Sequence, residues 1–572
     1  MTKNITLLFT IIIVIAVNII SSYLILNYDL TEDKKFTLSE QSKEVINKID
    51  DNLTIKVYLK GQLPAGFQLL SSSINDFLLN CRKINNKIDF EFINPRESNN
   101  EQQKLNIFNQ LQEQGLYATD LTIKKSSETS RKIIFPGAII YYKDKREAVN
   151  LLENDFGVSP QININNSIES IEFQIISTLN KLITNKKESI AFLKGNGELS
   201  SKQLLDVTES VNKDNNNLKY FYNVEDFNIK EFEIDSITNN PNIDGQLKKL
   251  LKFKAIIIAK PIIAFNKLDK LLIDQYIMNG GRLLMLIDGV HASIDSLNNK
   301  NGYFMSSKNN LNIDDQLFKY GVRINSDLIQ DQRATEIPII TGYSNNKPIQ
   351  EFFEWPYYPL LSNNTNHPIS KNIDAIKCDF VSSIDTLKNN IQKTILLTSS
   401  KKSRKTPAPS KISLSIIENP PPLETFNQPN IPIAVLLSGK FTSVFKDRII
   451  TKKNSIDLKK KSDSTKIIIV ADGDLISNTV SDNNISYPLG YDKFINYTYK
   501  GNKKFIINAI QYLCDETGIV NLKSKDIKLR MLNNEIIQNN KNTIMLINIF
   551  LPILLFLTSI LIFNTINKRK YD

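Results

Sequence analysis

The C-terminus carries the feature that most restricts what this chain can fold into: an uncharged apolar run over residues 544–563, followed by a Lys-Arg-Lys tail. About 20 helical residues are enough to cross a hydrocarbon layer roughly 30 Å thick. The alternative is a buried core helix, but a core helix of this length normally carries a polar face, which this run lacks. The sequence therefore predicts a membrane-spanning helix at 544–563 and a basic tail at 564–572.

A second uncharged run lies near the N-terminus, over residues 5–26. The alternative here is a cleaved signal peptide, whose apolar region is only ~7–15 residues long and ends at a small-residue cleavage site. No cysteine precedes Cys81, which argues against a lipoprotein anchor. We therefore expect an uncleaved transmembrane helix within residues 1–27. With two spans and a basic tail, the positive-inside rule predicts cytoplasmic termini and a large region outside the membrane.

The composition is that of a folded protein, because 41% of the residues are hydrophobic and the 71 basic residues are interleaved with 60 acidic ones. The two clear basic runs, 401–405 and 452–461, are expected to be solvated loops. The alternative is that these loops bind anionic lipid or an envelope polymer. A nucleic-acid partner is not expected for a region outside the membrane.

Residues 28–155 are expected to form a small membrane-proximal α/β domain. Alternating and helical apolar spacings predict strand, helix, strand and helix, followed by paired strands. These elements are expected at 53–61, 70–81, 87–95, 101–115, 116–125 and 131–143. The order suggests a thioredoxin-like outline, but without a CxxC motif the domain would have no redox role.

Residues 156–530 are expected to form a doubly wound α/β domain, flavodoxin-like or glutamine-amidotransferase-like. Nearly continuous apolar strands alternate with helices, as in a parallel sheet covered on both faces. The strands are expected at 189–195, 254–261, 282–288 and 465–474, and the helices at 167–185, 198–211, 266–281 and 503–516. We also expect a β-rich insertion at about 325–450, an exposed loop at 399–432 within it, and a polar linker at 531–543.

The motifs of several enzyme classes are absent from the sequence. No GxxxxGK[ST] phosphate loop, HExxH zinc motif or GxSxG elbow occurs. An amidotransferase needs a nucleophilic cysteine on a tight turn after a strand. Cys81, Cys378 and Cys514 all lie in runs that read as helix or strand instead. The sequence thus predicts no catalytic, cofactor-binding or metal-binding residues and favours a binding or structural module.

Two weaker patterns follow predicted strands. The segment GNGEL at 195–199 is interpreted as a tight strand-to-helix turn, with a ligand contact through Glu198 or the backbone amides as the alternative. Asp472 and Asp474 in ADGD could hold a cation, but the sequence offers no third ligand in register. His367, in NHPIS, is expected to be a loop residue ordered by Pro368.

Five segments together resemble the GldG family of gliding-motility proteins and related auxiliary proteins of ABC transporters. They occur in that family's order and span nearly the whole chain. The segments are YDLTEDKKFTLSEQS (28–42), LLIDQYIMNGGRLLMLID (271–288), NHPISKNI (366–373), IIIVADGDLISN (467–478) and GNKKFIINAIQYLCDETGI (501–519).

The resemblance implies a non-catalytic, substrate-binding-like subunit of an ABC-type complex in a Bacteroidetes-like inner membrane. Its implied partners are a separate ATPase and a multi-span permease, and the bulk of the chain would be periplasmic. We further expect Asn18 and Asn548, which are polar residues within the two spans, to contact partner helices. Two alternatives stay open: an extracytoplasmic enzyme of amidotransferase-like fold with an unrecognised nucleophile, and a passive envelope scaffold.

Overall fold

The protein is described by a computed structural model that divides into a globular unit up to Lys525 and a C-terminal unit from Asp526. The predicted first span at 5–26 lies outside the described residues, as does most of the predicted linker at 531–543. The described residues are 37–97, 100–125, 128–153, 159–184, 187–212, 214, 216–234, 240–299, 301–361, 365–448, 458–524 and 540–571.

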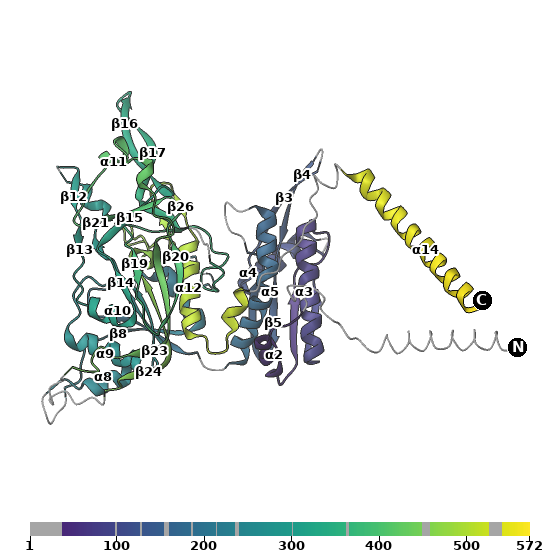
Figure 1. Cartoon of the computed structure of the whole chain (residues 1–572), viewed down its shortest axis with the longest axis horizontal. Coiled ribbons are helices and arrows are strands. Elements are labelled where there is room, and N and C mark those ends of the chain that lie inside the picture. The colour runs from purple at the N-terminus through teal and green to yellow at the C-terminus, as the bar shows by residue number, and fades with distance from the viewer. Residues whose placement is uncertain are drawn as a thin grey trace. The chain divides into compact units, whose positions relative to one another are not determined.

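The small domain follows the expected order of strands and helices as far as residue 125, but the single strand expected at 131–143 is wrong, because residues 128–134 and 137–142 form two strands that lie in different sheets. Its sheet has the order β2-β1-β5-β6, in which β1 and β2 are parallel and β5 is antiparallel to both β1 and β6. The hairpin β3-β4 is inserted between α4 and β5 (Figure 1). The elements are α2 (Glu40–Asn47), β1 (Leu53–Val57), α3 (Ala65–Ile84), β2 (Ile88–Phe92), α4 (Glu101–Glu113), β3 (Thr119–Lys125), β4 (Glu128–Ile134), β5 (Gly137–Tyr142), β6 (Lys145–Asn150) and α5 (Pro160–Ile183).

Helices α3 and α5 hold this domain together, although the sequence predicts α5 as part of the large domain at 156–530; α5 packs instead on α2, α3 and β6. The buried residues of α3 recur at helical spacing, and they are Phe67, Leu70, Ile74, Leu78 and Cys81. Helix α5 begins at Pro160, where the Ser159 side chain accepts a hydrogen bond from the Ile162 amide and caps the first turn. Figure 1 shows the two helices side by side along the sheet.

The large domain is built on a seven-stranded sheet of order β20-β23-β24-β10-β9-β7-β8. The five strands from β24 to β8 are parallel, whereas β23 and β20 are antiparallel. The strands are β7 (Ser189–Lys194), β8 (Asn223–Asn228), β9 (Ala255–Ala259), β10 (Arg282–Leu286), β20 (Gln392–Thr398), β23 (Pro432–Thr442) and β24 (Lys461–Val470).

Both faces of the large sheet are covered, so its central strand β9 is apolar and buried throughout. In β9, Ala255, Ile257 and Ala259 pack on the side of α12, while Ile256 and Ile258 pack on the side of α8, α9 and α10. The helices are α6 (Leu205–Thr208), α7 (Leu218–Phe221), α8 (Ile243–Leu250), α9 (Lys267–Met278), α10 (Asp314–Tyr320) and α12 (Gly501–Cys514). The mixed α/β class is therefore confirmed.

The predicted helix at 198–211 is wrong for most of its length, because α6 covers only Leu205–Thr208. The preceding residues form turns in which the amide and hydroxyl of Ser200 both donate to Oε1 of Gln203. Such local side-chain bonds compete with helix formation.

The predicted limits of the β-rich insertion, 325–450, are also wrong. Strands β20 and β23 fall inside them but pair in the main sheet, whereas irregular structure begins directly after β10. The apolar run of β23 supplies a strand buried on both faces, which is the physical reason for its place there. The other elements between β10 and β24 are β11 (Val290–His291), η1 (Ile294–Leu297), β12 (Tyr303–Met305), β13 (Ser307–Lys308), β14 (Val322–Ile324), β15 (Asp327–Asp331), β16 (Ala334–Ser344), β17 (Lys347–Leu361), β18 (Ile376–Lys377), β19 (Ile384–Thr386), β21 (Ser403–Pro407), β22 (Lys411–Ser413), α11 (Ser415–Glu418) and η2 (Leu423–Thr425).

The expected exposed loop at 399–432 contains a strand and is tied to its neighbours. Strand β21 pairs with β15, and the Ser400 amide donates to Oδ2 of Asp331 over 2.7 Å. The basic run 401–405 lies largely in this strand, where Nε of Arg404 donates to Gln330. This run is therefore not the free solvated loop that the sequence predicted. Of the second run, only residues 458–461 are described.

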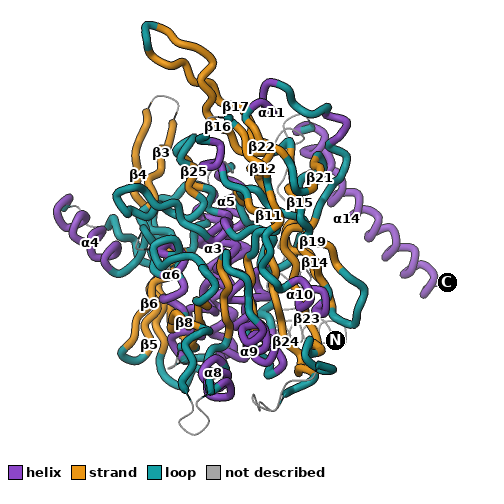
Figure 2. The backbone as a smooth tube through the Cα atoms, turned by 90° about the vertical axis from the view of Figure 1, so that its left-hand side faces the viewer, coloured by secondary structure: helices purple, strands orange, loops and turns teal. Residues whose placement is uncertain are grey.

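The hairpin β16-β17 projects from the large domain (Figure 2). Its base packs around Trp355, which is fully buried. Farther out, Ile340 pairs with Gln350 and Tyr343 pairs with Pro348, and these residues are exposed. The outer half of the hairpin therefore exposes apolar side chains to solvent.

The described part of the C-terminal unit contains the helix α14 (Lys541–Tyr571), and its stretch at Lys541–Asn564 is long and apolar enough to cross a membrane. The predicted span at 544–563 lies inside it. The helix is longer than predicted at both ends, since it includes the end of the expected linker and most of the basic tail. The structure therefore supports one candidate membrane helix at the C-terminus.

Candidate functional site

Three parallel strands place charged residues together at the carboxyl edge of the large sheet. Lys260 follows β9, Asp288 follows β10, and Asp472 and Asp474 follow β24, where η3 (Asp474–Ile476) begins. The carboxylate oxygens of the three aspartates lie within 4.8 Å of one another. Sequence reasoning found two of these carboxylates and missed Asp288, although it follows a buried strand just as Asp472 does.

The ammonium group of Lys260 lies inside this carboxylate cluster. Its Nζ bonds to Oδ1 of Asp474 and lies 3.6 Å from Oδ2 of Asp288. Burial alone would lower the pKa of Lys260, but Asp474 and Asp288 outweigh it and the net shift is upward. A protonated lysine therefore supplies the positive charge that a cation would otherwise bring.

The Asp472 carboxylate is occupied by backbone amides. Its Oδ1 accepts from the amides of Asp474 and Leu475, and its Oδ2 accepts from the amide of Asp379. Burial and the neighbouring Asp474 hold the pKa of Asp472 well above its usual range. Asp472 thus caps the turn after β24, and the cluster joins strand ends rather than presenting an open metal site.

The GNGEL turn forms at the end of β7, as the sequence predicts. The carbonyl of Asn196 accepts from the amides of Ile262 and Ile263, and Oε2 of Glu198 accepts from the Asn196 amide over 2.8 Å. Burial raises the pKa of Glu198. These bonds tie the turn to the segment after β9.

The three cysteines are buried, and burial raises the pKa of each thiol. The pKa of Cys514 rises to about 12, and Cys378 lies against the Asp472 carboxyl, which adds to its upward shift. Because the thiolate is the nucleophile, these are poor candidates for nucleophilic catalysis.

His367 is a loop residue, as predicted, and burial lowers its pKa to about 4. Its carbonyl accepts from the amides of Ser370 and Lys371, and its Nδ1 accepts from the Ile369 amide. The ring packs edge-on against Tyr512, with 4.8 Å between ring centroids. His367 therefore orders its own turn and packs against α12.

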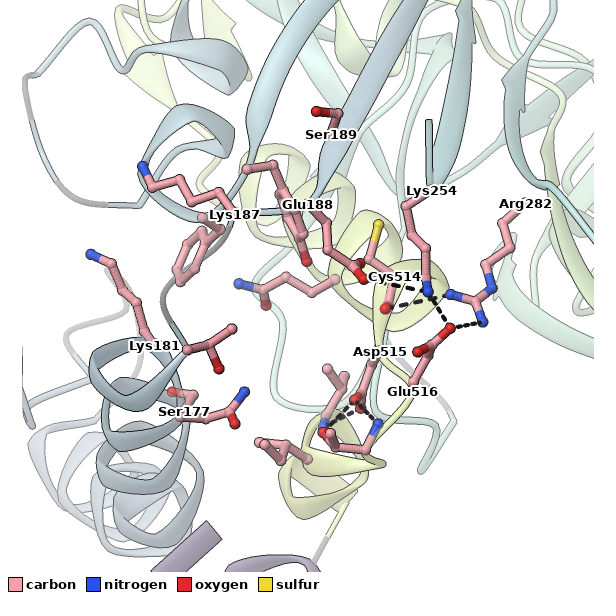
Figure 3. A pocket seen from close by; sticks show the side chains of 18 of the residues that line it. Ser177, Lys181, Lys187, Glu188, Ser189, Lys254, Arg282, Cys514, Asp515 and Glu516 are labelled. Atoms are coloured by element: carbon pink, nitrogen blue, oxygen red, sulfur yellow. Dashed lines mark hydrogen bonds and ion pairs between the residues drawn. The ribbon is translucent and has the colours of Figure 1, made fainter. Parts of the chain in front are cut away.

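A cleft of about 980 Å³ lies at the opposite, amino edge of the large sheet. One wall is α5, which contributes Ser177 and Lys181, and the other carries Lys254, Arg282 and the end of α12 (Figure 3). Sequence reasoning did not find this cleft, because its residues come from segments that are distant along the chain and share no motif.

The chain passes between the two domains beside this cleft. Residues 184, 187 and 188 lie between α5 and β7, and residues 515–518 lead from α12 to η4 (Ile519–Ser524), which packs back on α5. Thr184, Glu188, Cys514 and Ile519 line the cleft. A ligand in the cleft would thus contact both domains and both connections between them.

The acidic side chains of the cleft have partners. Glu147 pairs with Lys181 over 2.7 Å, and Glu516 pairs with Lys254 and Arg282. The Asp515 carboxylate accepts hydrogen bonds from the amides of Thr517, Gly518 and Val520 and so caps the turn after α12. The carboxylates therefore do not offer free negative charge to a ligand.

Comparison with known proteins identifies the family of the large domain. The family model described as "ABC-type uncharacterized transport system" matches residues 187–509. The chain belongs to this family. As an ABC-type transport auxiliary protein, it has an accessory role in an ABC system, and its C-terminal apolar helix is consistent with membrane association. A second model, described as a domain of unknown function, matches residues 32–141 in the small domain.

Two further likenesses extend beyond the family models. An uncharacterized protein of Borreliella burgdorferi is 24% identical over 99% of this auxiliary protein and 98% of the relative. Among solved structures, the mmIFT52 N-terminal domain covers 57% of this chain and 96% of its own, at 14% identity and a TM-score of 0.30. That structural likeness is too slight to indicate function.

Proposed function

We propose that this protein is a non-catalytic, GldG-like subunit of an ABC complex, in which a separate ATPase and a multi-span permease are its partners. The observation that carries the proposal is the family match across most of the large domain. The sequence supports this division of labour because it holds no phosphate-loop motif with which to hydrolyse ATP. An association with gliding motility, in a Bacteroidetes-like inner membrane, is the finer form of the proposal.

The two ends of the globular unit support a two-span attachment with cytoplasmic termini. The first described helix, α2, and the last, η4, both pack on α5. A methyl group placed on Gly518, just before η4, would lie 3.6 Å from Gln41 in α2. The chain therefore enters and leaves this unit at neighbouring points, as expected if two membrane helices flank one periplasmic region.

Within this proposal, α5 transmits force between the membrane and the large domain. Its Glu169 bonds to Nδ2 of Asn372 over 3.1 Å, and Glu172 accepts from the hydroxyl of Ser42 in α2 over 2.6 Å. The parallel β1-β2 pair and antiparallel β5-β6 pair support a thioredoxin-like outline for the small domain. This domain would thus serve as a rigid coupling piece.

Affinity purification from the native host in mild detergent tests the partner assignment. We expect a tagged full-length chain to co-purify a phosphate-loop ATPase and a multi-span permease in near-equal amounts, as identified by mass spectrometry. A tagged unrelated protein with two membrane spans is the control. Recovery of neither partner above that control would contradict the proposal.

A further inference from the structure

The cleft at the amino edge of the large sheet carries more positive than negative side chains. Seven cationic residues line it, against four carboxylates. The cationic residues are Lys48, Lys145, Lys181, Lys187, Lys252, Lys254 and Arg282, and the acidic ones are Glu147, Glu188, Asp515 and Glu516. Because the carboxylates are engaged by Lys181, Lys254, Arg282 and backbone amides, the cleft keeps a surplus of positive charge, to which Lys48, Lys187 and Lys252 contribute.

Three of these lysines are exposed at the cleft and come from different parts of the fold. Lys48 ends α2 in the small domain, Lys187 lies in the connection to β7, and Lys252 precedes β9. Among the residues that the structure describes, none of the three forms an ion pair with a carboxylate, and Lys187 donates only to the carbonyl of Lys219. Their charges therefore add to the field of the cleft instead of cancelling within it.

The remaining lining residues suit a ligand that carries apolar or polar groups as well as a negative charge. Phe173 and Phe221 contribute aromatic surface, and Asn180, Asn279 and Gln511 contribute amide groups. Binding sites commonly combine an apolar lining with a few polar groups and lie between domains. Lysine ammonium groups serve as point charges for phosphate.

We propose that this cleft binds a phosphate-bearing anion, with Lys48, Lys187 and Lys252 supplying the attraction and both domains supplying the walls. Of the basic runs that the sequence singled out, 401–405 is less suited to this role, since its residues 403–405 are paired in β21. The anion has two possible sources: the headgroup of an anionic phospholipid, or a water-soluble phosphate compound. Its binding would hold the small and large domains together across both of their connections.

This inference deepens the proposed function by assigning a ligand class, but it does not depend on the ATPase or permease. The experiment uses the purified full chain alone in a neutral detergent, with three probes titrated by isothermal calorimetry. These are dihexanoyl-phosphatidylglycerol, dihexanoyl-phosphatidylcholine and inorganic phosphate. Failure to recover partners and failure to bind anions can therefore be told apart.

The variant Lys48→Gln/Lys187→Gln/Lys252→Gln removes the three unpaired charges at the cleft. The matched control is Lys319→Gln/Lys347→Gln/Lys401→Gln, which removes three exposed charges elsewhere. We expect at least a tenfold loss of affinity for the anionic probe in the cleft variant and less than a twofold change in the control. Equal thermal stability of the two variants checks that the cleft variant is folded.

The titrations distinguish the two sources of the anion from each other and from a failure of the binding proposal. Binding of phosphatidylglycerol that inorganic phosphate does not displace supports a lipid headgroup, while displacement supports a soluble phosphate compound. Binding should weaken several-fold on raising the salt from 0.05 to 0.5 M, since salt screens exposed charges. Equal binding of the two phospholipids, no binding of any probe, or equal losses in the two variants would overturn the proposal.

Discussion

At the scale of single residues, the charged cluster after β9, β10 and β24 shows how a motif is completed by the fold. Lys260 and Asp288 lie far from Asp474 along the sequence, and parallel strands bring all three together. Gly473 is needed here because a Cβ at that position would lie 2.6 Å from Cγ of Lys260 and 3.0 Å from Oδ1 of Asp288. We interpret the cluster as a set of ion pairs that links the ends of these strands.

Replacing Lys260 tests that interpretation. We expect Lys260→Met to lower the free energy of unfolding by about 1–3 kcal/mol at pH 7.5, because it leaves the partly buried Asp288 and Asp474 without their cation. Adding Asp474→Asn should recover part of the loss. Urea unfolding of both variants measures the effect, with Lys319→Met as an exposed control expected to change it by less than about 0.5 kcal/mol.

The loss of stability caused by Lys260→Met should depend on pH in a defined direction. Burial and Asp288 raise the pKa of Asp474 in the native protein to about 6 from an ordinary value of 3.8. The folded state thus binds this proton more tightly than the unfolded state, and the group stabilises the fold as pH falls from 6 towards 4. Without Lys260 the upward shift should increase, so the loss in Lys260→Met should be smaller at pH 5 than at pH 7.5. An equal loss at both pH values would contradict the interpretation.

At the scale of elements, the β16-β17 hairpin contributes to the fold only through its base. Between Ile340 and Gln350 every residue is exposed except Gly342, whereas Ile337 and Trp355 are buried. Two residues at its tip, Asn345 and Asn346, have positive φ, as in the tight turns that suit the twist of a hairpin. The outer half is therefore an appendage on a packed base.

Shortening the hairpin should leave the stability of the protein unchanged. We expect replacement of residues 340–350 by Asn-Gly to change the free energy of unfolding by less than about 1 kcal/mol, because exposed residues contribute little burial. Urea unfolding of the full chain measures this. Trp355→Ala at the base, which removes a fully buried side chain, is the contrasting variant and should cost about 3–5 kcal/mol. Similar losses in the two would show that the outer half is packed after all.

At the scale of the whole molecule, the globular unit closes on itself before the C-terminal helix begins. Residues Ile519, Val520 and Leu522 of η4 are buried, and η4 packs on α5. Lys523 continues this contact, with its Nζ 3.0 Å from Oε1 of Gln511 and over the ring of Phe173. The last described turn of the globular unit is therefore part of its core.

Truncations on either side of η4 test this boundary. We expect a chain ending at Ser524 to keep the melting temperature of the full chain, because α14 belongs to a separate unit. A chain ending at Cys514 should lose about 3 kcal/mol or more, since three buried apolar side chains and the Lys523 contacts are removed. Differential scanning calorimetry compares the three proteins. Equal stability of the two truncated chains would show that η4 is not part of the fold.

The sequence by itself determined the class of the fold and the position of the C-terminal apolar helix, a candidate membrane span. Period-two and continuous apolar runs placed β7, β9, β10 and β24, because side chains buried on both faces must be apolar. Long uncharged helices are equally easy to recognise in a sequence, because a hydrocarbon layer tolerates few charges. The apolar pattern predicts too long a helix at 198–211, because side-chain hydrogen bonds of Ser200 compete with helix formation there.

Only the tertiary structure decided which residues meet. Asp288 lies beside Asp472 and Asp474 because the neighbouring parallel strands β10 and β24 end at the same edge of the sheet. The sequence of a single strand does not reveal which strands are its neighbours. The interdomain cleft likewise depends on how α5 docks against the amino edge of the sheet, which places Lys48, Lys187 and Lys252 around one space. Local sequence patterns report burial along an element, whereas a site is set by contacts between elements far apart in the chain.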